Sequence, residues 1–143
     1  MSEIITSTST KQTQDLAAKL LHQYSHRVIA LIGPLGAGKT TFAQGLGASL
    51  GIKKMLSPTY TLIRQYPLSS KANFSTLYHI DLYRLASFDE ITMLGLEEIL
   101  ADPHNLVLIE WPEKILDTLP PHLEIQFEKL PNNDRQITIS EVQ

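Results

Sequence analysis

The stretch from Val28 to Thr41 reads VIALIGPLGAGKTT and decides the fold. Its first part, Val28–Ile32, is an uninterrupted apolar run rich in β-branched side chains, which is typical of a central strand buried on both faces. The segment GPLGAGKT follows and matches the pattern G-x-x-x-x-G-K-[ST] without a mismatch. Apolar residues then recur at helical spacing over Lys39–Leu50. Strand, glycine-rich loop and helix in this order predict a loop that binds phosphate groups through its backbone.

Each residue type in this loop suits that chemistry. Glycines let the backbone turn so that N–H groups point inward, and a helix N-terminus favours anions. Lys39 is expected to reach the β- and γ-phosphates of a nucleotide, and the Thr40 hydroxyl to ligate Mg²⁺. A chance match in a chain of this length has a probability well below roughly 0.01. The candidate nucleotide-binding residues of this segment are Gly33, Gly36, Ala37, Gly38, Lys39, Thr40 and Thr41.

The composition excludes several classes of protein. With 143 residues, 43% of them apolar and 19% charged, the chain is expected to form one globular domain over residues 1–143. A net charge of -3 argues against general coating of nucleic acids, and zero cysteines exclude disulfides and thiolate metal sites. No apolar run approaches the roughly 20 residues of a membrane helix. The first residues, MSEIITSTSTKQTQ, have no secretory pattern, so we expect a cytoplasmic protein that contacts no membrane.

Helices and buried strands alternate along most of the chain. This order predicts an α/β fold, with a mainly parallel central sheet flanked by helices and antiparallel C-terminal edge strands. The remaining predicted helices cover Ser9–Tyr24, Phe88–Leu100 and, as a short one, Pro112–Leu119; the remaining strands cover Ser57–Tyr66, Tyr78–Tyr83, Leu106–Ile109, Leu123–Phe127 and Gln136–Ile139, the last two joined by the turn PNND.

A second stretch, LVLIEWP at 106–112, ends a buried strand with a carboxylate. Burying Glu110 is costly unless something pairs with it. Nucleotide-binding proteins with such a glycine loop use a second acid, usually at a strand end, to hold Mg²⁺. We therefore expect Glu110 to share the metal with Thr40. This combination is that of the P-loop NTPase fold.

Asp81, in YHIDLY, is the rival acid. It could bind metal-bound water, orient the attacking water, or pair with Arg84 or Arg64. His79, on the same strand face, is expected to be a partially buried histidine with a partner and not a catalyst, since phosphoryl transfer depends on positioning and charge more than on a strong base. The candidate catalytic residues are Lys39, Asp81 and Glu110.

Three further residues are candidates for contact with the nucleotide. Thr59 and Thr61, in SPTYTL, could form a switch that senses the γ-phosphate, or they could be ordinary strand threonines. Arg135, before the last strand, could stack on the base or contact phosphate. Since the guanine-reading pattern N-K-x-D is missing from the sequence, ATP is favoured over GTP.

Six separated motifs stand in one order: GPLGAGKTT, SPTYTL, YHIDLYRL, LGLEEIL, LVLIEWPE and NDRQITI. In that order they resemble the TsaE family (also called YjeE), bacterial P-loop ATPases needed for the threonylcarbamoyladenosine (t6A) modification of tRNA. The resemblance implies a Mg²⁺-dependent ATPase of low intrinsic activity that acts with TsaB and TsaD. It also implies contact with tRNA only through that complex, and no catalysis of the transfer itself.

The resemblance carries over to particular positions. Gly36 to Thr41 match the family's nucleotide-binding segment, Thr40 and Glu110 match its Mg²⁺ ligands, and Asp81 matches the acid of its H-x-D-L-Y-R motif. In addition, the family's N-terminal contact with the nucleotide corresponds to Ser9 or its neighbour Thr10, and its late arginine to Arg135.

Two alternatives from other classes stay open. The first is a kinase of a small molecule, which would need an acceptor site and an arginine-bearing lid. The only candidate lid, Pro67–Phe74, contains no arginine. The second is a non-catalytic binding module whose partner contacts are gated by nucleotide.

Overall fold

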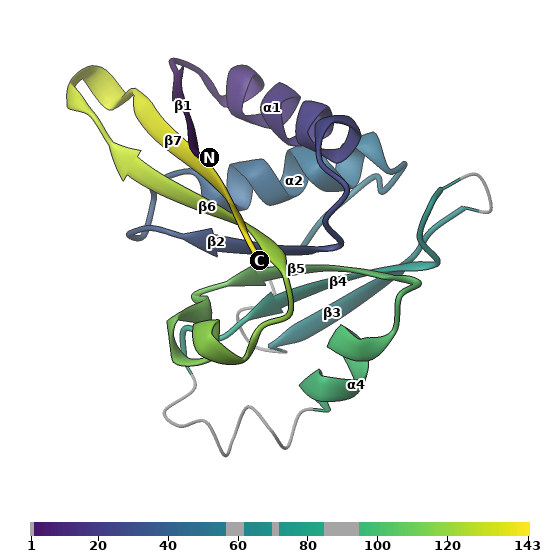
Figure 1. Cartoon of the computed structure of the whole chain (residues 1–143). Helices are drawn as coiled ribbons and strands as arrows, with labels where there is room; N and C mark the ends of the chain where they lie inside the picture. Colours follow the sequence, from purple (N-terminus) through teal and green to yellow (C-terminus); the bar gives the residue numbers. More distant parts are fainter. Residues whose placement is uncertain (1, 57–61, 70–71, 85–94) are drawn as a thin grey trace.

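The computed structural model describes residues 2–56, 62–69, 72–84 and 95–143. They form one seven-stranded sheet with the strand order β1-β7-β6-β2-β5-β4-β3 (Figure 1). The strands are β1 (Ser2–Ser7), β2 (Val28–Ile32), β3 (Ile63–Pro67), β4 (Thr76–Asp81), β5 (Asn105–Glu110), β6 (His122–Lys129) and β7 (Arg135–Val142); the helices are α1 (Thr10–Gln23), α2 (Lys39–Ser49) and α4 (Leu96–Ala101), with short 3-10 turns η1 (Pro112–Lys114), η2 (Leu116–Thr118) and η3 (Pro131–Asn133).

The sheet is mixed, which corrects the expectation of a mainly parallel one. Strands β6, β2, β5 and β4 pair in parallel at its centre. Both borders are antiparallel: β1 and β7 follow β6 on one side, and β3 pairs with β4 on the other. The predicted antiparallel strands at the C-terminus are confirmed. The β3–β4 pair is antiparallel because the segment between them is short, whereas parallel strands need a crossover of a dozen or more residues.

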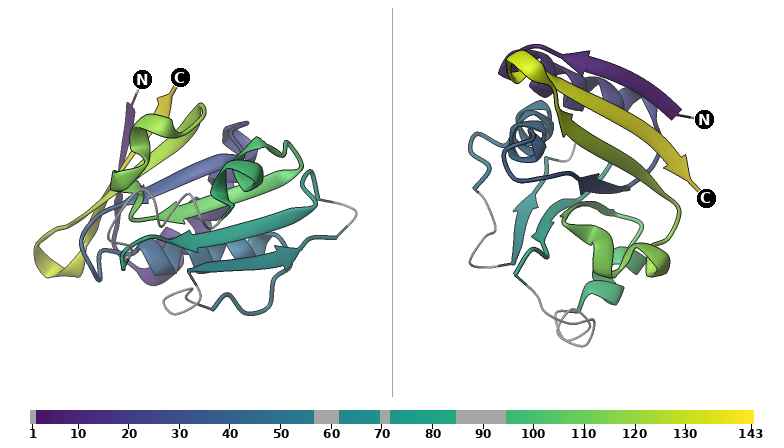
Figure 2. Two further views of the ribbon diagram at one scale, coloured as in Figure 1. Left: turned by 90° about the horizontal axis from the view of Figure 1, so that it is seen from below. Right: turned by 90° about the vertical axis from the view of Figure 1, so that its left-hand side faces the viewer.

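Helices cover the two faces of the sheet unequally. In Figure 2, α1 and α2 lie together over one face, while α4 and the turns η1 and η2 lie against the other. The apolar residues of β5 alternate between the two resulting cores: Leu106 and Leu108 face α1 and α2, and Val107 and Ile109 face the opposite core. Every residue of β5 is buried, which explains its uninterrupted apolar run.

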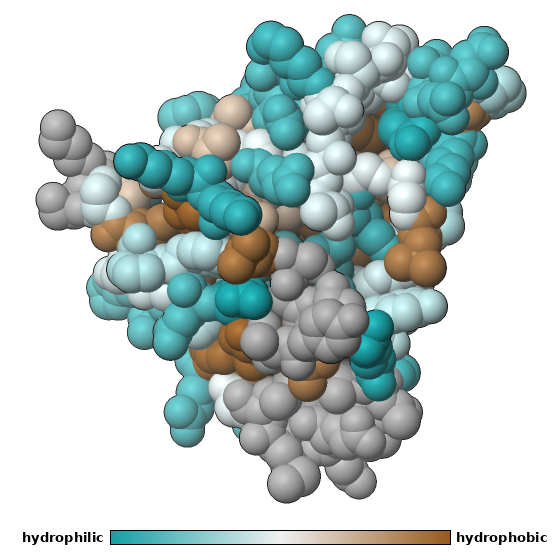
Figure 3. Space-filling model, turned by 180° about the vertical axis from the view of Figure 1, so that it is seen from behind, coloured by the Kyte–Doolittle hydropathy of each residue, from teal (hydrophilic) through white to brown (hydrophobic). Residues whose placement is uncertain are grey.

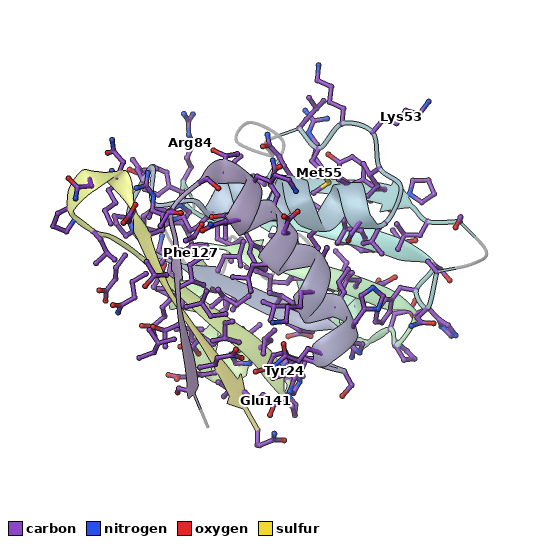
Figure 4. The ribbon with its side chains drawn as sticks, turned by 90° about the horizontal axis from the view of Figure 1, so that it is seen from above. Tyr24, Lys53, Met55, Arg84, Phe127 and Glu141 are labelled. Carbon is purple, nitrogen blue, oxygen red and sulfur yellow. The ribbon has the colours of Figure 1, made fainter. Side chains whose placement is uncertain are left out.

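The two helices of the larger layer approach each other closely. A Cβ added at Gly45 of α2 would lie 2.5 Å from the Cα of Gln14 in α1, so the absence of a side chain permits this packing. Met55 fills the space beside Gly47, and the Phe42 and Phe127 rings meet edge to face at 5.7 Å (Figure 4). This packing fixes α2, and therefore the loop before it, against β2 and β6.

Three local predictions differ from the structure. Strand β1 was not predicted, and it pairs along its whole length with β7. Pro112–Leu119 forms two 3-10 turns in place of a helix. The predicted helix Phe88–Leu100 is interrupted at Gly95, which is left-handed and precedes α4; its segment 88–94 lies outside the described residues, as do 57–61 of the predicted strand Ser57–Tyr66.

The face of the molecule behind the view of Figure 1 is mixed in hydropathy. Figure 3 shows one face on which apolar side chains of the described residues form small, separate groups among polar ones. Within the described ranges, no helix has both the length and the apolar character required to cross a membrane.

Candidate functional site

The glycine-rich loop lies at the carboxyl end of the parallel strands, between β2 and α2. Gly33 opens the loop directly against β6, where an added Cβ would lie 2.7 Å from the backbone oxygen of Phe127. Gly38 precedes α2 with a φ of 111°, a conformation that side chains rarely adopt. Gly33 is thus required by the close approach of the loop to β6, and Gly38 by its left-handed backbone conformation. In open α/β sheets, ligands bind outside this edge of the sheet.

A cavity of about 490 Å³ opens at this edge. It brings together most of the predicted site residues, from five separate parts of the chain. The predicted residues that line it are Ser9, Thr10, Gly36, Gly38, Lys39, Thr40, Thr41, Asp81, Glu110 and Arg135. Gly33 and Ala37 do not line it, and the Ala37 side chain is buried in the core. Thr59 and Thr61 lie outside the described residues.

Lys39 is the first residue of α2 and only 4% exposed. Its ammonium group donates a hydrogen bond to the Gly33 carbonyl and lies 3.4 Å from the centroid of the Trp111 ring. A desolvated cation–π contact of this kind contributes about 2 kcal/mol. Burial lowers the pKa of the Lys39 ammonium, and the negative charge of Glu110 opposes that shift. The lysine is therefore held folded back on its own loop.

Glu110 ends β5 and is also only 4% exposed. Its Oε2 accepts a hydrogen bond from Nε2 of His79 on β4 at 2.6 Å. This contact answers how the carboxylate can be buried at the end of an apolar strand, since a hydrogen bond to a charged acceptor offsets part of its desolvation. The expected partner of His79 is confirmed at this nitrogen, whereas the residue is fully buried and not partially buried as expected. Its Nδ1 is buried without a partner.

Asp81 is the direct neighbour of Glu110 in the parallel pairing of β4 with β5. Its Oδ1 accepts a hydrogen bond from the backbone N–H of Tyr83 at 2.9 Å. Burial raises the pKa of the Asp81 carboxyl, this hydrogen bond lowers it, and the charge of Glu110 raises it further. Two carboxylates on adjacent strands thus face the same cavity.

Arg135 connects the β6–β7 turn to the glycine loop. Its Nη2 donates to the Gly36 carbonyl at 3.2 Å, and its Nη1 donates to the carbonyls of Asn133 at 2.6 Å and Asp134 at 3.2 Å. The guanidinium is therefore occupied by backbone oxygens at the cavity wall, where it supplies a fixed positive charge.

The N-terminus of α1 forms the wall opposite the loop. Ser9 is the N-cap of this helix, since its hydroxyl accepts from the Gln12 N–H at 3.1 Å. Behind it, the hydroxyls of Ser7 and Thr13 lie 2.7 Å apart. This wall exists because β1 pairs with β7, which sets Ser7 opposite Arg135.

Sequence reasoning missed five residues of the lining: Ser7, Thr8, Thr13, Leu35 and Asn133. Trp111 also lines the cavity, directly after Glu110 in the E-W-P motif, and its ring lies both over Lys39 and 4.8 Å from the Tyr83 ring. Its φ of 58° turns the chain sharply after β5. For Ser7 and Thr13, no signal in the sequence places β1 next to β7.

The chemistry of the arrangement is that of an anion site beside an oxygen-rich site. Loop N–H groups, a helix N-terminus, Lys39 and Arg135 favour anionic groups. Thr40, Asp81 and Glu110 supply oxygen donors. Among the described residues there is no group of three or more His, Asp or Glu side chains that could hold a metal by themselves.

These features define an α/β protein in which a glycine-rich loop and two strand-end carboxylates line one cavity. A sequence model of the family described as "Threonylcarbamoyl adenosine biosynthesis protein TsaE" matches residues 7–137, and the chain belongs to this family. The structure is also similar to a crystal structure of YdiB from Bacillus subtilis, with a TM-score of 0.77 and 29% identity over 100% of this chain and 87% of the other.

Several relatives carry the name "tRNA threonylcarbamoyladenosine biosynthesis protein TsaE". The one from Rickettsia conorii is 43% identical over 139 residues, which covers 92% of this chain and 74% of the relative. The one from Bacillus subtilis is 38% identical, over 80% of this chain and 70% of the relative. The one from Borreliella burgdorferi is 42% identical, over 66% of each. The chain thus spans roughly two thirds to three quarters of the length of these relatives.

Proposed function

We infer that the chain is a Mg²⁺-dependent ATPase with a P-loop NTPase fold that serves the t6A modification of tRNA. In this proposal it acts in the cytoplasm with TsaB and TsaD, does not transfer the threonylcarbamoyl group itself, and reaches tRNA only through that complex. Membership of the TsaE family supports the pathway, and the cavity supports the chemistry.

One observation carries the proposal. The glycine loop, Lys39, Thr40, Asp81 and Glu110 line a single cavity at the carboxyl end of the parallel strands. Its volume of about 490 Å³ lies within the range of roughly 300–1,000 Å³ that small-molecule sites have. Backbone N–H groups before α2 and the Lys39 ammonium suit the phosphates, and the wall formed by α1 and Arg135 lies where the rest of the nucleotide would extend.

The oxygen donors present fit Mg²⁺. This ion is usually held by one or two carboxylates together with waters and substrate phosphates, and not by a cage of protein ligands alone. Thr40 and Glu110 are the expected ligands, while Asp81 is placed to hold a water of the metal or the attacking water. When bound, Mg²⁺ would neutralise charge on the β- and γ-phosphate oxygens.

The protein residues then have separate roles. Lys39 leaves the Gly33 carbonyl and the Trp111 ring for the phosphates, because an anionic oxygen is a stronger acceptor than either. Arg135 keeps the loop in place through Gly36 and adds positive charge beside it. The reaction needs little from the protein besides positioning and charge, so low intrinsic turnover is expected until a partner completes the site.

Nucleotide binding is tested with Lys39→Ala, measured by calorimetry with ADP and ATP. The control is Lys53→Ala, an exposed lysine that points away from the body of the protein in Figure 4. We expect at least a hundredfold loss of affinity for Lys39→Ala and none for Lys53→Ala. Equal affinity of the two variants would refute the nucleotide site.

The pathway is tested by reconstituting tRNA modification with purified TsaB and TsaD under multiple-turnover conditions, with and without this chain. We expect sustained t6A formation only with the native chain, and neither Lys39→Ala nor Glu110→Ala should replace it. If Glu110→Ala supports modification while Lys39→Ala does not, the chain is a nucleotide-gated binding module. If phosphate moves to a small acceptor faster than to water, the chain is a kinase.

A further inference from the structure

His79 and Glu110 form a buried pair, and only Glu110 of the two lines the cavity. His79 is 1% exposed, and its Nε2 lies 2.6 Å from Oε2 of Glu110. Oε2 of Glu110 is therefore bound by the His79 ring, which belongs to the neighbouring strand β4.

The hydrogen-bonding capacity of the two groups assigns the proton. A carboxylate only accepts, so Nε2 of His79 must donate. Nδ1 is buried and has no partner in the described part of the chain, so a proton there would be an unsatisfied buried donor. Nε2 is therefore the donor of this contact, and the ring holds Oε2 of Glu110 through it.

Arg64 of β3 is paired directly opposite His79 in the antiparallel register, so the ring stands on β4 between β3 and β5, on one face of the sheet.

We propose that His79 is a positioning residue that holds Glu110 by Oε2 and so presents Oε1 to a divalent cation in the cavity. The proposal rests on the proposed function, because it concerns the metal expected at Glu110. Sheet geometry supports it: Asp81 and Glu110 are direct neighbours, and His79 lies two residues before Asp81 on the same face of β4. Partners of this kind usually change metal affinity about 10- to 100-fold when they are removed.

The test measures binding of Mn²⁺ to the ADP complex by electron paramagnetic resonance, beside ADP affinity in chelator and thermal unfolding. His79→Leu removes the donor, and His79→Gln keeps an N–H donor near the position of Nε2. The matched control is His122→Leu, a histidine that is 2% exposed, lies 3.4 Å from the Glu124 carboxylate and does not line the cavity.

We expect His79→Leu to weaken Mn²⁺ binding 10- to 100-fold while ADP affinity in chelator changes less than twofold. His79→Gln should recover Mn²⁺ affinity to within about threefold of native, and His122→Leu should leave it unchanged. Native Mn²⁺ affinity in a folded His79→Leu would overturn the proposal, as would a folded His79→Gln that binds Mn²⁺ more than tenfold weaker than native. If His79→Leu does not fold, His79→Gln alone decides.

The same measurements separate this proposal from the proposed function. If the native chain binds no ADP in chelator, or its ADP complex binds Mn²⁺ no better than free ADP does, the proposed function fails and His79 has no metal to position. If native binding is strong and coupled to the metal, only the His79 variants decide the further inference.

Discussion

Gly33→Ala tests whether the glycine loop binds phosphate in the position that the structure gives it. An added Cβ would lie 2.7 Å from the backbone oxygen of Phe127 and 3.0 Å from its Cβ. Ordinary contacts begin near 3.4 Å, so the loop has to retreat from β6 by the difference, 0.7 Å. Because the Phe127 backbone belongs to the sheet, the loop and not the strand must move.

The size of the effect follows from this displacement. Overpacking of this kind costs about 1–3 kcal/mol of unfolding free energy. For a domain of this size each kcal/mol lowers Tm by roughly 3–4 °C, so we expect a fall of about 3–12 °C. Displacing a catalytic constellation by 1 Å can cost about a hundredfold, so nucleotide affinity and kcat/KM should both fall by roughly 10- to 100-fold.

The control is Gly51→Ala, at a position after α2. Gly51 has a φ of 84° and nothing within 4 Å of an added Cβ, so this variant adds backbone strain without a clash. It should lose about 1–2 kcal/mol of stability and no nucleotide affinity. Calorimetry with ADP and thermal unfolding compare the two. If Gly33→Ala keeps native affinity, the loop does not bind phosphate in this conformation.

Substitutions at three further positions test separate walls of the cavity. Burial raises the pKa of the Asp81 carboxyl above its ordinary 3.8, so the native state binds this proton more tightly than the unfolded state does. The free energy of unfolding therefore falls as the pH rises through the raised pKa. Asp81→Asn should accordingly raise Tm at pH 7 but not below pH 3.8, and it should lower ATP turnover. An equal Tm change at both pH values would contradict this. Arg135→Ala should weaken ADP binding about tenfold, and Arg135→Lys should not restore it, because lysine cannot bond several carbonyls in a plane; full rescue by lysine would show that charge alone matters. Trp111→Ala should lower Mg²⁺ affinity and turnover, because the ring that packs on Lys39 and the turn that aims Glu110 change together; unchanged values of both would refute that role.

The parts of the fold that the sequence predicted are those with local causes. The apolar run of β2, the glycine pattern and the helical spacing of α2 are adjacent in the chain, so their order alone predicted the loop. Strand pairing is less local: the antiparallel β6–β7 pair follows from a turn, but the β1–β7 pair depends on contact between distant segments. Strand β1 has the polar, alternating sequence SEIITS, and its partner β7 lies more than 120 residues further on. The sequence therefore predicted neither this pairing nor the cavity wall that depends on it.

The site divides in the same way. Lys39, Thr40 and Glu110 were predicted because each follows or ends a recognisable element. The contact of His79 with Glu110 depends on β4 lying beside β5, and the place of Arg135 depends on the β6–β7 turn reaching the loop. The residue types predicted the chemistry of the site, whereas the contacts between its side chains depend on the order of the strands in the sheet.

The two buried charges of the cavity are kept apart, and this separation has a physical consequence. Lys39 is held by the Gly33 carbonyl and the Trp111 ring, and Glu110 by His79, with no ion pair between the two in this described part of the chain. A direct pair would neutralise both groups within the fold, whereas separate partners leave each charge directed at a ligand. Burying the two charges lowers the stability of the fold, so a ligand that offsets this cost must carry both negative and positive charge. Anionic phosphates with a bound dication meet that condition, and each should therefore strengthen the binding of the other.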